Sequence, residues 1–364
     1  MNIFKHIQMT NPETHWLSRT ECTVMRGVAI LAIVLHNYCH WLRGIVRENE
    51  FTFNISNAHG MWQNLLHPDG LLPLHLFSFL GHYGMPLFVL LSGYGLASKY
   101  GREEHLPVWR FVRYHYLKLF GMMAVGLVAF TMVDMMTRGS FHYQALDILA
   151  QLAMIINLFP EPHHTIWPGP FWFFGLIMQL YIIYILFIHR RHWLVPVALV
   201  VVCWAVQVGC IPNGEELNYL RYNCVSGMLP FVGGVMLARV ERSHLMSAWR
   251  NKGWGWHLLV ALLLTLLVIP VSAYFHLWLW GTLLVPLAMV SWIRLVPASW
   301  HKPMGWVGGV SAAMFVSHPI ARKVFISLSH RQELYDGLVL YVVAVMVLAW
   351  VMSMLLNKVK KPAL

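Results

Sequence analysis

Arg26-Gly-Val-Ala-Ile-Leu-Ala-Ile-Val-Leu-His36-Asn37-Tyr38-Cys39-His40 places two histidines inside an apolar run that begins with a cation. On an α-helix, which rises about 1.5 Å per residue, His36 lies about 15 Å from Arg26. That distance is about half of a hydrocarbon core roughly 30 Å thick. If Arg26 lies at one membrane surface, His36 is near the bilayer centre, where an ionisable side chain is a candidate for function. The structural alternative is a neutral histidine that is hydrogen-bonded between helices.

The composition indicates an all-α integral membrane protein. Of the 364 residues, 58% are hydrophobic and 11% are charged, and the mean hydropathy is +0.57. A soluble domain carries about 25% charged residues. In a membrane protein, a net charge of +11 is explained by an excess of Lys and Arg in cytoplasmic loops. No basic run is interleaved with aromatic residues on a soluble domain, so we exclude nucleic acid as a partner and expect a lipid bilayer instead.

Ten apolar segments are long enough to be spans. They are residues 23–42, 72–98, 111–134, 170–188, 193–211, 225–240, 256–275, 277–295, 304–326 and 337–357. We expect them to form one membrane domain, 23–357, between a polar N-terminal segment, 1–22, and a basic tail, 358–364. This arrangement shows no internal repeat.

Residues 145–159 are also apolar, but the segment is too short to cross a bilayer comfortably. If this segment does not cross, and if the N-terminus is inside, the basic segments all lie on the cytoplasmic side, as the positive-inside rule requires. These segments are 99–118, Arg190-Arg191, 239–252, 294–302 and the tail. We therefore predict about ten spans, with both termini cytoplasmic and 145–159 interfacial or re-entrant.

The first span resembles the opening motif of the integral-membrane acyltransferase 3 family, in which an arginine precedes a histidine on the first transmembrane helix. The family usually has ten residues between the two, whereas nine separate Arg26 from His36, and the family's histidine position falls on Asn37. At about 100° per residue, His40 lies nearer than His36 to the helix face of Arg26. His36 is the first candidate for the catalytic histidine and His40 the second.

Arginines at the start of the third span form a candidate phosphate site. Arg110 and Arg113 are three residues apart and share a helix face. Guanidinium groups bind phosphate in a bidentate manner, although ordinary positive-inside anchoring also explains such residues. The pair resembles the family's arginine pair, which implies that it binds the phosphate-rich end of an acyl-coenzyme A donor together with Arg26. Lys118 could add to this site or extend to the membrane interface.

Two later segments resemble family motifs, and their polar residues, Gln179 and Tyr181 among them, are candidates for binding the acceptor. The fourth span contains Gln179 and Tyr181. Ile177 and Met178 stand where many relatives have a glutamate, so this span provides no acidic partner for the histidine. The ninth span carries further candidates. They are Ser311 and Arg322 for binding an acceptor, which could be anionic, and His318 for orienting its hydroxyl or sharing the proton.

These motifs predict a membrane O-acyltransferase, most simply an acetyltransferase that uses acetyl-coenzyme A. The resemblance implies an acceptor hydroxyl on a surface glycan or its lipid-linked precursor, in a bacterial inner membrane. A secondary transporter is the alternative, although transporters typically show repeated halves. No two-histidine-plus-carboxylate spacing predicts a metal site. Cys210 and Cys224 flank one short loop and either pair or stay free, and the oligomeric state is open.

Overall fold

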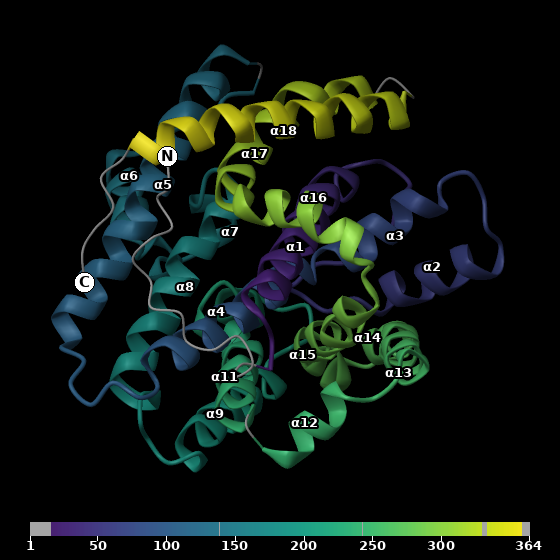
Figure 1. Ribbon diagram of the computed structural model, residues 1–364. Helices are drawn as coiled ribbons and strands as arrows, with labels where there is room; N and C mark the ends of the chain where they lie inside the picture. The colour runs from purple at the N-terminus through teal and green to yellow at the C-terminus, as the bar shows by residue number, and fades with distance from the viewer. Residues whose placement is uncertain (1–15, 138, 242, 330–332, 359–364) are drawn as a thin grey trace.

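The computed structural model describes residues 16–137, 139–241, 243–329 and 333–358. Most of the expected N-terminal segment and of the basic tail therefore lies outside the described residues. The described residues form helices and connecting segments, with no strand among them, as expected for an all-α protein (Figure 1). The helices are α1 (Arg19–Cys39), α2 (Ile55–Leu66), α3 (Leu72–Gly81), α4 (Gly84–Tyr100), α5 (Val108–Met136), α6 (Ala145–Leu152), α7 (Pro162–Thr165), α8 (Trp172–Ile183), α9 (Leu194–Val208), α10 (Glu215–Arg221), α11 (Cys224–Val240), α12 (His244–Arg250), α13 (Trp254–Leu266), α14 (Val268–Ser272), α15 (Phe275–Trp292), α16 (Ala298–Gly309), α17 (Ser311–Ser329) and α18 (Leu334–Lys358). Short 3₁₀ turns cover Ile156–Leu158, Gly169–Phe171 and Ile293–Leu295, and a π-helical turn, Tyr184–Ile188, extends α8.

Seven helical segments of the described chain are long and apolar enough to cross a membrane. An eighth is the pair α10 and α11, which is bent by 43° at a break. The expected count of ten also includes α9, which has 15 residues, and α17, which carries two cations. Every expected span coincides with a helix or a broken pair of helices, and the multi-pass membrane character is confirmed.

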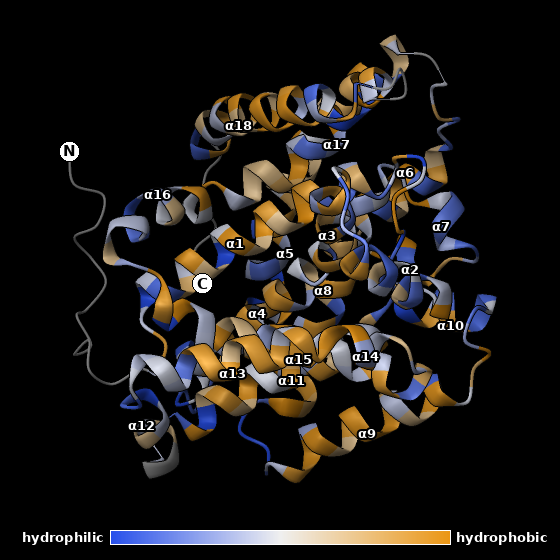
Figure 2. Ribbon diagram, turned by 90° about the vertical axis from the view of Figure 1, so that its right-hand side faces the viewer, coloured by the Kyte–Doolittle hydropathy of each residue, from blue (hydrophilic) through white to orange (hydrophobic). Residues whose placement is uncertain are grey.

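The surface of these helices suits lipid. Large apolar side chains are exposed on the outer faces, among them Val128 on α5, Leu263 on α13 and Val343 on α18. Figure 2 shows hydrophilic segments at two ends, α7 and α10 at one and α12 at the other, with the apolar helices α9, α13 and α15 between them. The α12 end belongs to the loops predicted to be cytoplasmic, and the α7 and α10 end to those predicted to be outside.

Helix α1 begins where a capping box satisfies its first backbone groups. The Ser18 hydroxyl accepts from the Glu21 backbone N–H at 3.1 Å, and the Glu21 carboxylate accepts from the Ser18 N–H at 2.7 Å. The middle of α1 then packs closely on the α3–α4 junction. A Cβ atom at Gly81 would lie 2.7 Å from the Cβ atom of His36, and one at Gly84 would lie 2.4 Å from the Ala29 carbonyl oxygen. Glycine at these two positions therefore brings α3 against the histidine-bearing turn of α1.

Two segments differ in detail from the sequence prediction. Residues 145–159 fold as α6, of eight residues, and a 3₁₀ turn, so this segment is too short to cross, as expected. The span predicted at 304–326 is formed by two helices, because the chain breaks at Val310 into α16 and α17. The break places Ser311 at the start of a helix, and Gly308 on α16 lies against the Thr23 backbone of α1.

Candidate functional site

The imidazole of His36 is buried between α1 and α3. Its Nδ1 atom lies 2.8 Å from the backbone carbonyl oxygen of Ser78, on the last turns of α3. A carbonyl oxygen can only accept, so Nδ1 carries the proton in the neutral ring and Nε2 keeps its lone pair. This arrangement is the one that a general base requires.

Two further histidines surround this ring. The His40 ring centroid lies 5.1 Å and the His82 ring centroid 5.7 Å from that of His36. The Nδ1 atoms of His40 and His82 are buried and have no hydrogen-bond partner among the described residues. His82, which is not part of a family motif, thus lies beside the predicted candidates. Its position within an apolar span was the sequence feature that pointed to it. We call His36, His40 and His82 the histidine cluster.

Arg322 of α17 faces this cluster. Its Nη1 atom donates to the backbone oxygen of Asn37 at 3.3 Å and to the side-chain oxygen of Asn37 at 3.4 Å. Its charge is close enough to act on His36, His40 and His318. Arg322 has no carboxylate within ion-pair distance among the described residues. Asn37 therefore holds the guanidinium beside the cluster.

The neighbouring cation, Lys323, is placed very differently. Its Nζ atom lies 2.8 Å from Asp134 Oδ1, whose side chain is fully buried, and it also donates to the Gly139 carbonyl oxygen at 2.8 Å. Lys323 is thus neutralised within the fold. Arg322, unlike Lys323, has no described carboxylate partner and can interact with a substrate in this region.

His318 lies one helical turn before Arg322 and is fully buried. Its Nδ1 atom is 3.3 Å from the Met314 carbonyl oxygen, and its Nε2 atom is buried without a described partner. The structure therefore places His318 and Arg322 on adjacent turns of α17, and Arg322 reaches the turn of α1 that carries His36.

The segment between α1 and α2 carries buried polar groups near the cluster. The Ser78 hydroxyl donates to the Val46 carbonyl oxygen at 2.5 Å, which ties this segment to the residue that orients His36. Two residues further on, Glu48 is 1% exposed and its Oε1 atom accepts from the Trp278 indole at 2.9 Å. Burial raises the pKa of Glu48 to about 7. The fourth span lacks an acid, and the loop between α1 and α2 contributes a buried carboxylate on the outer side.

The other predicted acceptor residues have partners elsewhere. Gln179 contacts Asn223 at 2.8 Å and accepts from the Cys224 backbone at 2.8 Å, so it holds the start of α11. The Ser311 hydroxyl donates to the Gly308 carbonyl oxygen at 2.8 Å, at the break between α16 and α17. The structure therefore does not join these two side chains to the histidine cluster.

Tyr181 packs on α5 rather than on the histidine cluster. Its ring centroid is 4.7 Å from that of His115, a buried histidine that sequence reasoning missed. His115 follows the arginine pair on α5 by two residues, and its Nε2 atom has no described partner. A histidine within an apolar helix was the available signal, as it was for His82.

The predicted donor residues lie on two different helices. Arg110 and Arg113 are exposed at the start of α5, and Lys118 is exposed two turns later. Arg26 is exposed on α1, and its Nη2 atom donates to the Thr23 hydroxyl at 3.1 Å. Arg110 and Arg113 thus share a face of α5, whereas Arg26 lies on α1, and no described hydrogen bond links it to the pair.

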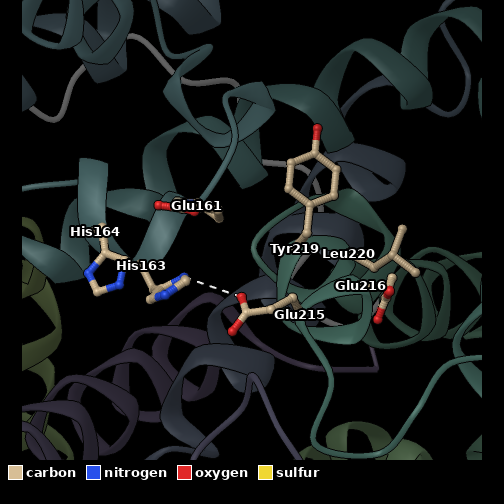
Figure 3. Close-up of a pocket in the computed structure, with 8 residues that line it drawn as sticks. Glu161, His163, His164, Glu215, Glu216, Tyr219 and Leu220 are labelled. Atoms are coloured by element: carbon tan, nitrogen blue, oxygen red, sulfur yellow. Dashed lines mark ion pairs between the residues drawn. The ribbon is translucent and has the colours of Figure 1, made fainter.

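A pocket of about 620 Å³ on the outer loops is not part of this site. It lies between α7 and α10, and Figure 3 shows His163 directed at Glu215, with 3.9 Å between Nδ1 and Oε2. The described residues contain no group of three His, Cys, Asp or Glu side chains placed to hold a metal ion. Cys210 and Cys224 are both free thiols.

Comparison with known proteins agrees with the motifs. A family model described as an acyltransferase domain matches residues 20–356, nearly the whole chain. No curated protein and no solved structure matches the chain. The family match includes all of the helices except the outermost residues of α1 and α18, and it covers the histidine cluster and Arg322. The chain is therefore a multi-pass membrane acyltransferase that belongs to the acyltransferase 3 family.

Proposed function

We propose that this protein transfers an acyl group, most simply acetyl, from cytoplasmic acyl-coenzyme A to a hydroxyl of a surface glycan or its lipid-linked precursor. The observation that carries the proposal is the orientation of His36. Its Nδ1–H is held by the Ser78 carbonyl oxygen at 2.8 Å, so Nε2 can accept a proton. The family match supports acyl transfer, and the helix lengths support a bilayer as its location.

In the proposed reaction, His36 Nε2 removes the proton from the acceptor hydroxyl as its oxygen attacks the thioester carbonyl carbon. The carbon–sulfur bond then breaks, and the coenzyme A thiolate leaves and takes up the proton from the imidazolium. A transient acyl group on the imidazole is the other route through the same residue. In either route, the rings of His40 and His82 lie beside the reacting imidazole, with centroids 5.1 and 5.7 Å away.

Arg322 supplies the positive charge that the reaction needs. A negative charge develops on the carbonyl oxygen in the transition state, and an oriented guanidinium in a water-poor site stabilises it strongly. The two bonds to Asn37, at 3.3 and 3.4 Å, fix the guanidinium near the cluster while leaving other N–H groups for a substrate. His318, one turn away, is placed to orient the acceptor hydroxyl.

The donor would approach from the end of the bundle where Arg110 and Arg113 are exposed, with Lys118 and Arg26 as further cations near that side. The pantetheine arm would then carry the thioester to the histidine cluster. We leave Gln179 and Ser311 out of the proposed acceptor site, because their polar atoms contact backbone or amide groups of the fold.

The experiment that tests the proposal is mass spectrometry of surface glycans from a bacterial deletion strain carrying the wild-type gene or an Arg322→Met variant. The proposal predicts a mass increase of one acyl group per modified sugar with the wild type and its loss with the variant. Purified protein that moves a solute across vesicles without acyl-coenzyme A, and that leaves the glycans unchanged, would contradict it.

A further inference from the structure

A second basic site lies at the end of the bundle that loop charge predicts to be cytoplasmic. It is a cavity of about 360 Å³ where the ends of α4 and α11 meet the segment that follows α8. Three guanidinium groups line it, those of Arg190, Arg191 and Arg239. These residues come from two separate basic segments of the sequence, so the fold gathers them. We call this cavity the arginine pocket.

The arginines of this pocket keep most of their hydrogen-bonding capacity. The Arg239 Nη2 atom donates to the Ile188 carbonyl oxygen at 2.7 Å, and Arg190 Nη1 lies 3.6 Å from Glu104 Oε1. The Glu104 side chain is 75% exposed, so water screens this ion pair. Each guanidinium has five N–H donors, and the described contacts use only a few of them. Among the described ion pairs, the Glu104 carboxylate alone opposes these three cations.

Capping of helix ends does not explain the whole arrangement. Arg239 does satisfy the carbonyl that ends the turn after α8, which is an ordinary structural role. Arg190 instead adopts a φ of 54°, a left-handed conformation that is unfavourable for a side chain of this size. Arg191, next to it, is exposed and lines the same cavity. The backbone thus directs two consecutive guanidinium groups to one place.

Aromatic side chains complete the pocket. Trp193 is 51% exposed on its wall, and Tyr184 is held by a 3.2 Å hydrogen bond to the Leu96 carbonyl oxygen. The Tyr184 ring lies 6.1 Å from that of Phe111, which stands between the two arginines at the start of α5. Phe111 is buried, whereas the two arginines are exposed, so the pocket lies beside the helix that carries the predicted donor arginines and is lined by other residues. The exposed indole of Trp193 offers a face on which a nucleobase can stack.

We infer that the arginine pocket binds the phosphorylated nucleotide end of the acyl-coenzyme A donor, an inference that rests on the proposed function. Paired guanidinium groups match phosphate geometry, and a cavity above about 300 Å³ is of the size that holds small ligands. An anionic lipid headgroup offers the same phosphate chemistry. The cavity and its exposed indole favour the nucleotide, because a headgroup has no base to stack.

The test is calorimetric titration of adenosine 3′,5′-bisphosphate and of coenzyme A into the full-length protein in phosphatidylcholine nanodiscs. We expect saturable binding that weakens at least tenfold in Arg191→Ala and in Trp193→Ala. Arg19→Ala removes an exposed arginine outside the pocket and should bind within twofold of wild type. An unchanged thermal transition confirms the fold of each variant.

Three outcomes separate this inference from the proposed function. Equal nucleotide affinity in wild type and Arg191→Ala overturns the pocket, even if acyl transfer persists. Arg191-dependent nucleotide binding without any acyl transfer supports the pocket and contradicts the proposed reaction. Arg191-dependent binding of spin-labelled phosphatidylglycerol, with no nucleotide binding in phosphatidylcholine, assigns the pocket to lipid and overturns the inference.

Discussion

The Nδ1 atom of His36 and the backbone carbonyl oxygen of Ser78 are 2.8 Å apart, across the contact between α1 and α3. The Ser78 hydroxyl also donates to the Val46 carbonyl oxygen, so the same residue joins α3 to the outer segment. This relationship fixes both the tautomer and the direction of the imidazole. The chemistry of His36 therefore depends on how closely α3 approaches α1.

Enlarging Gly81 should separate the two helices. In Gly81→Ala the new Cβ atom would lie 2.5 Å from the Ala32 carbonyl oxygen and 2.7 Å from the His36 Cβ atom, so α3 must shift. We expect acyl transfer to fall at least tenfold, because a displacement of this kind misplaces the base. The matched control is Gly95→Ala, where nothing lies within 4 Å and activity should be retained. Equal turnover in both variants would show that the helix contact is unimportant.

Substitution of Arg322 should reduce turnover, whereas substitution of its neighbour Lys323 should reduce stability. Arg322→Met removes the charge that stabilises the transition state, so we expect turnover to fall about 10²-fold or more. Because Arg322 has no carboxylate partner among the described residues, thermal stability should change little. Lys323→Met leaves the buried Asp134 carboxylate unpaired and should destabilise the fold by about 3 to 5 kcal/mol. Turnover and thermal transitions of both variants check this prediction. The double variant Lys323→Met, Asp134→Asn should recover stability, and a stable Lys323→Met single variant would contradict it.

Glu48 should make stability depend on pH. Burial raises its pKa from 4.5 to about 7, so the folded state holds the proton more tightly than the unfolded state. The contribution of this group to folding is therefore most favourable below about pH 4.5 and declines as pH rises toward 7, by up to about 3 kcal/mol. Glu48→Gln keeps the oxygen that accepts from Trp278 and removes the titration. Thermal transitions in detergent at pH 5.5 and 8 should differ less in the variant, and an identical pH response would refute the assignment.

The sequence predicts the span positions well, because apolar length alone distinguishes lipid-crossing helices from other segments. It predicts less well where a helix breaks. Nothing in the local apolar pattern distinguishes a continuous helix 304–326 from the break at Val310, because the contact of Gly308 with the Thr23 backbone is tertiary.

The candidate site is predictable only in part. Burial of ionisable groups within spans pointed to His36 and His318, and loop charge pointed to the exposed Arg110 and Arg113. Spacing could not show that Arg322 reaches Asn37 from a helix far along the chain. Spacing also could not show that the side-chain amide of Gln179 is hydrogen-bonded to the start of α11. Such contacts depend on three-dimensional packing that no local pattern encodes.

The proposed reaction depends on His36 rather than His40 as the proton acceptor. Turnover of acetyl-coenzyme A by the purified protein, with a glycan acceptor, should be measured for wild type, His36→Gln and His40→Gln at equal protein stability. We expect a loss of about 10²-fold or more in His36→Gln and a smaller loss in His40→Gln. Wild-type turnover in His36→Gln, with the loss confined to His40→Gln, would contradict the assignment.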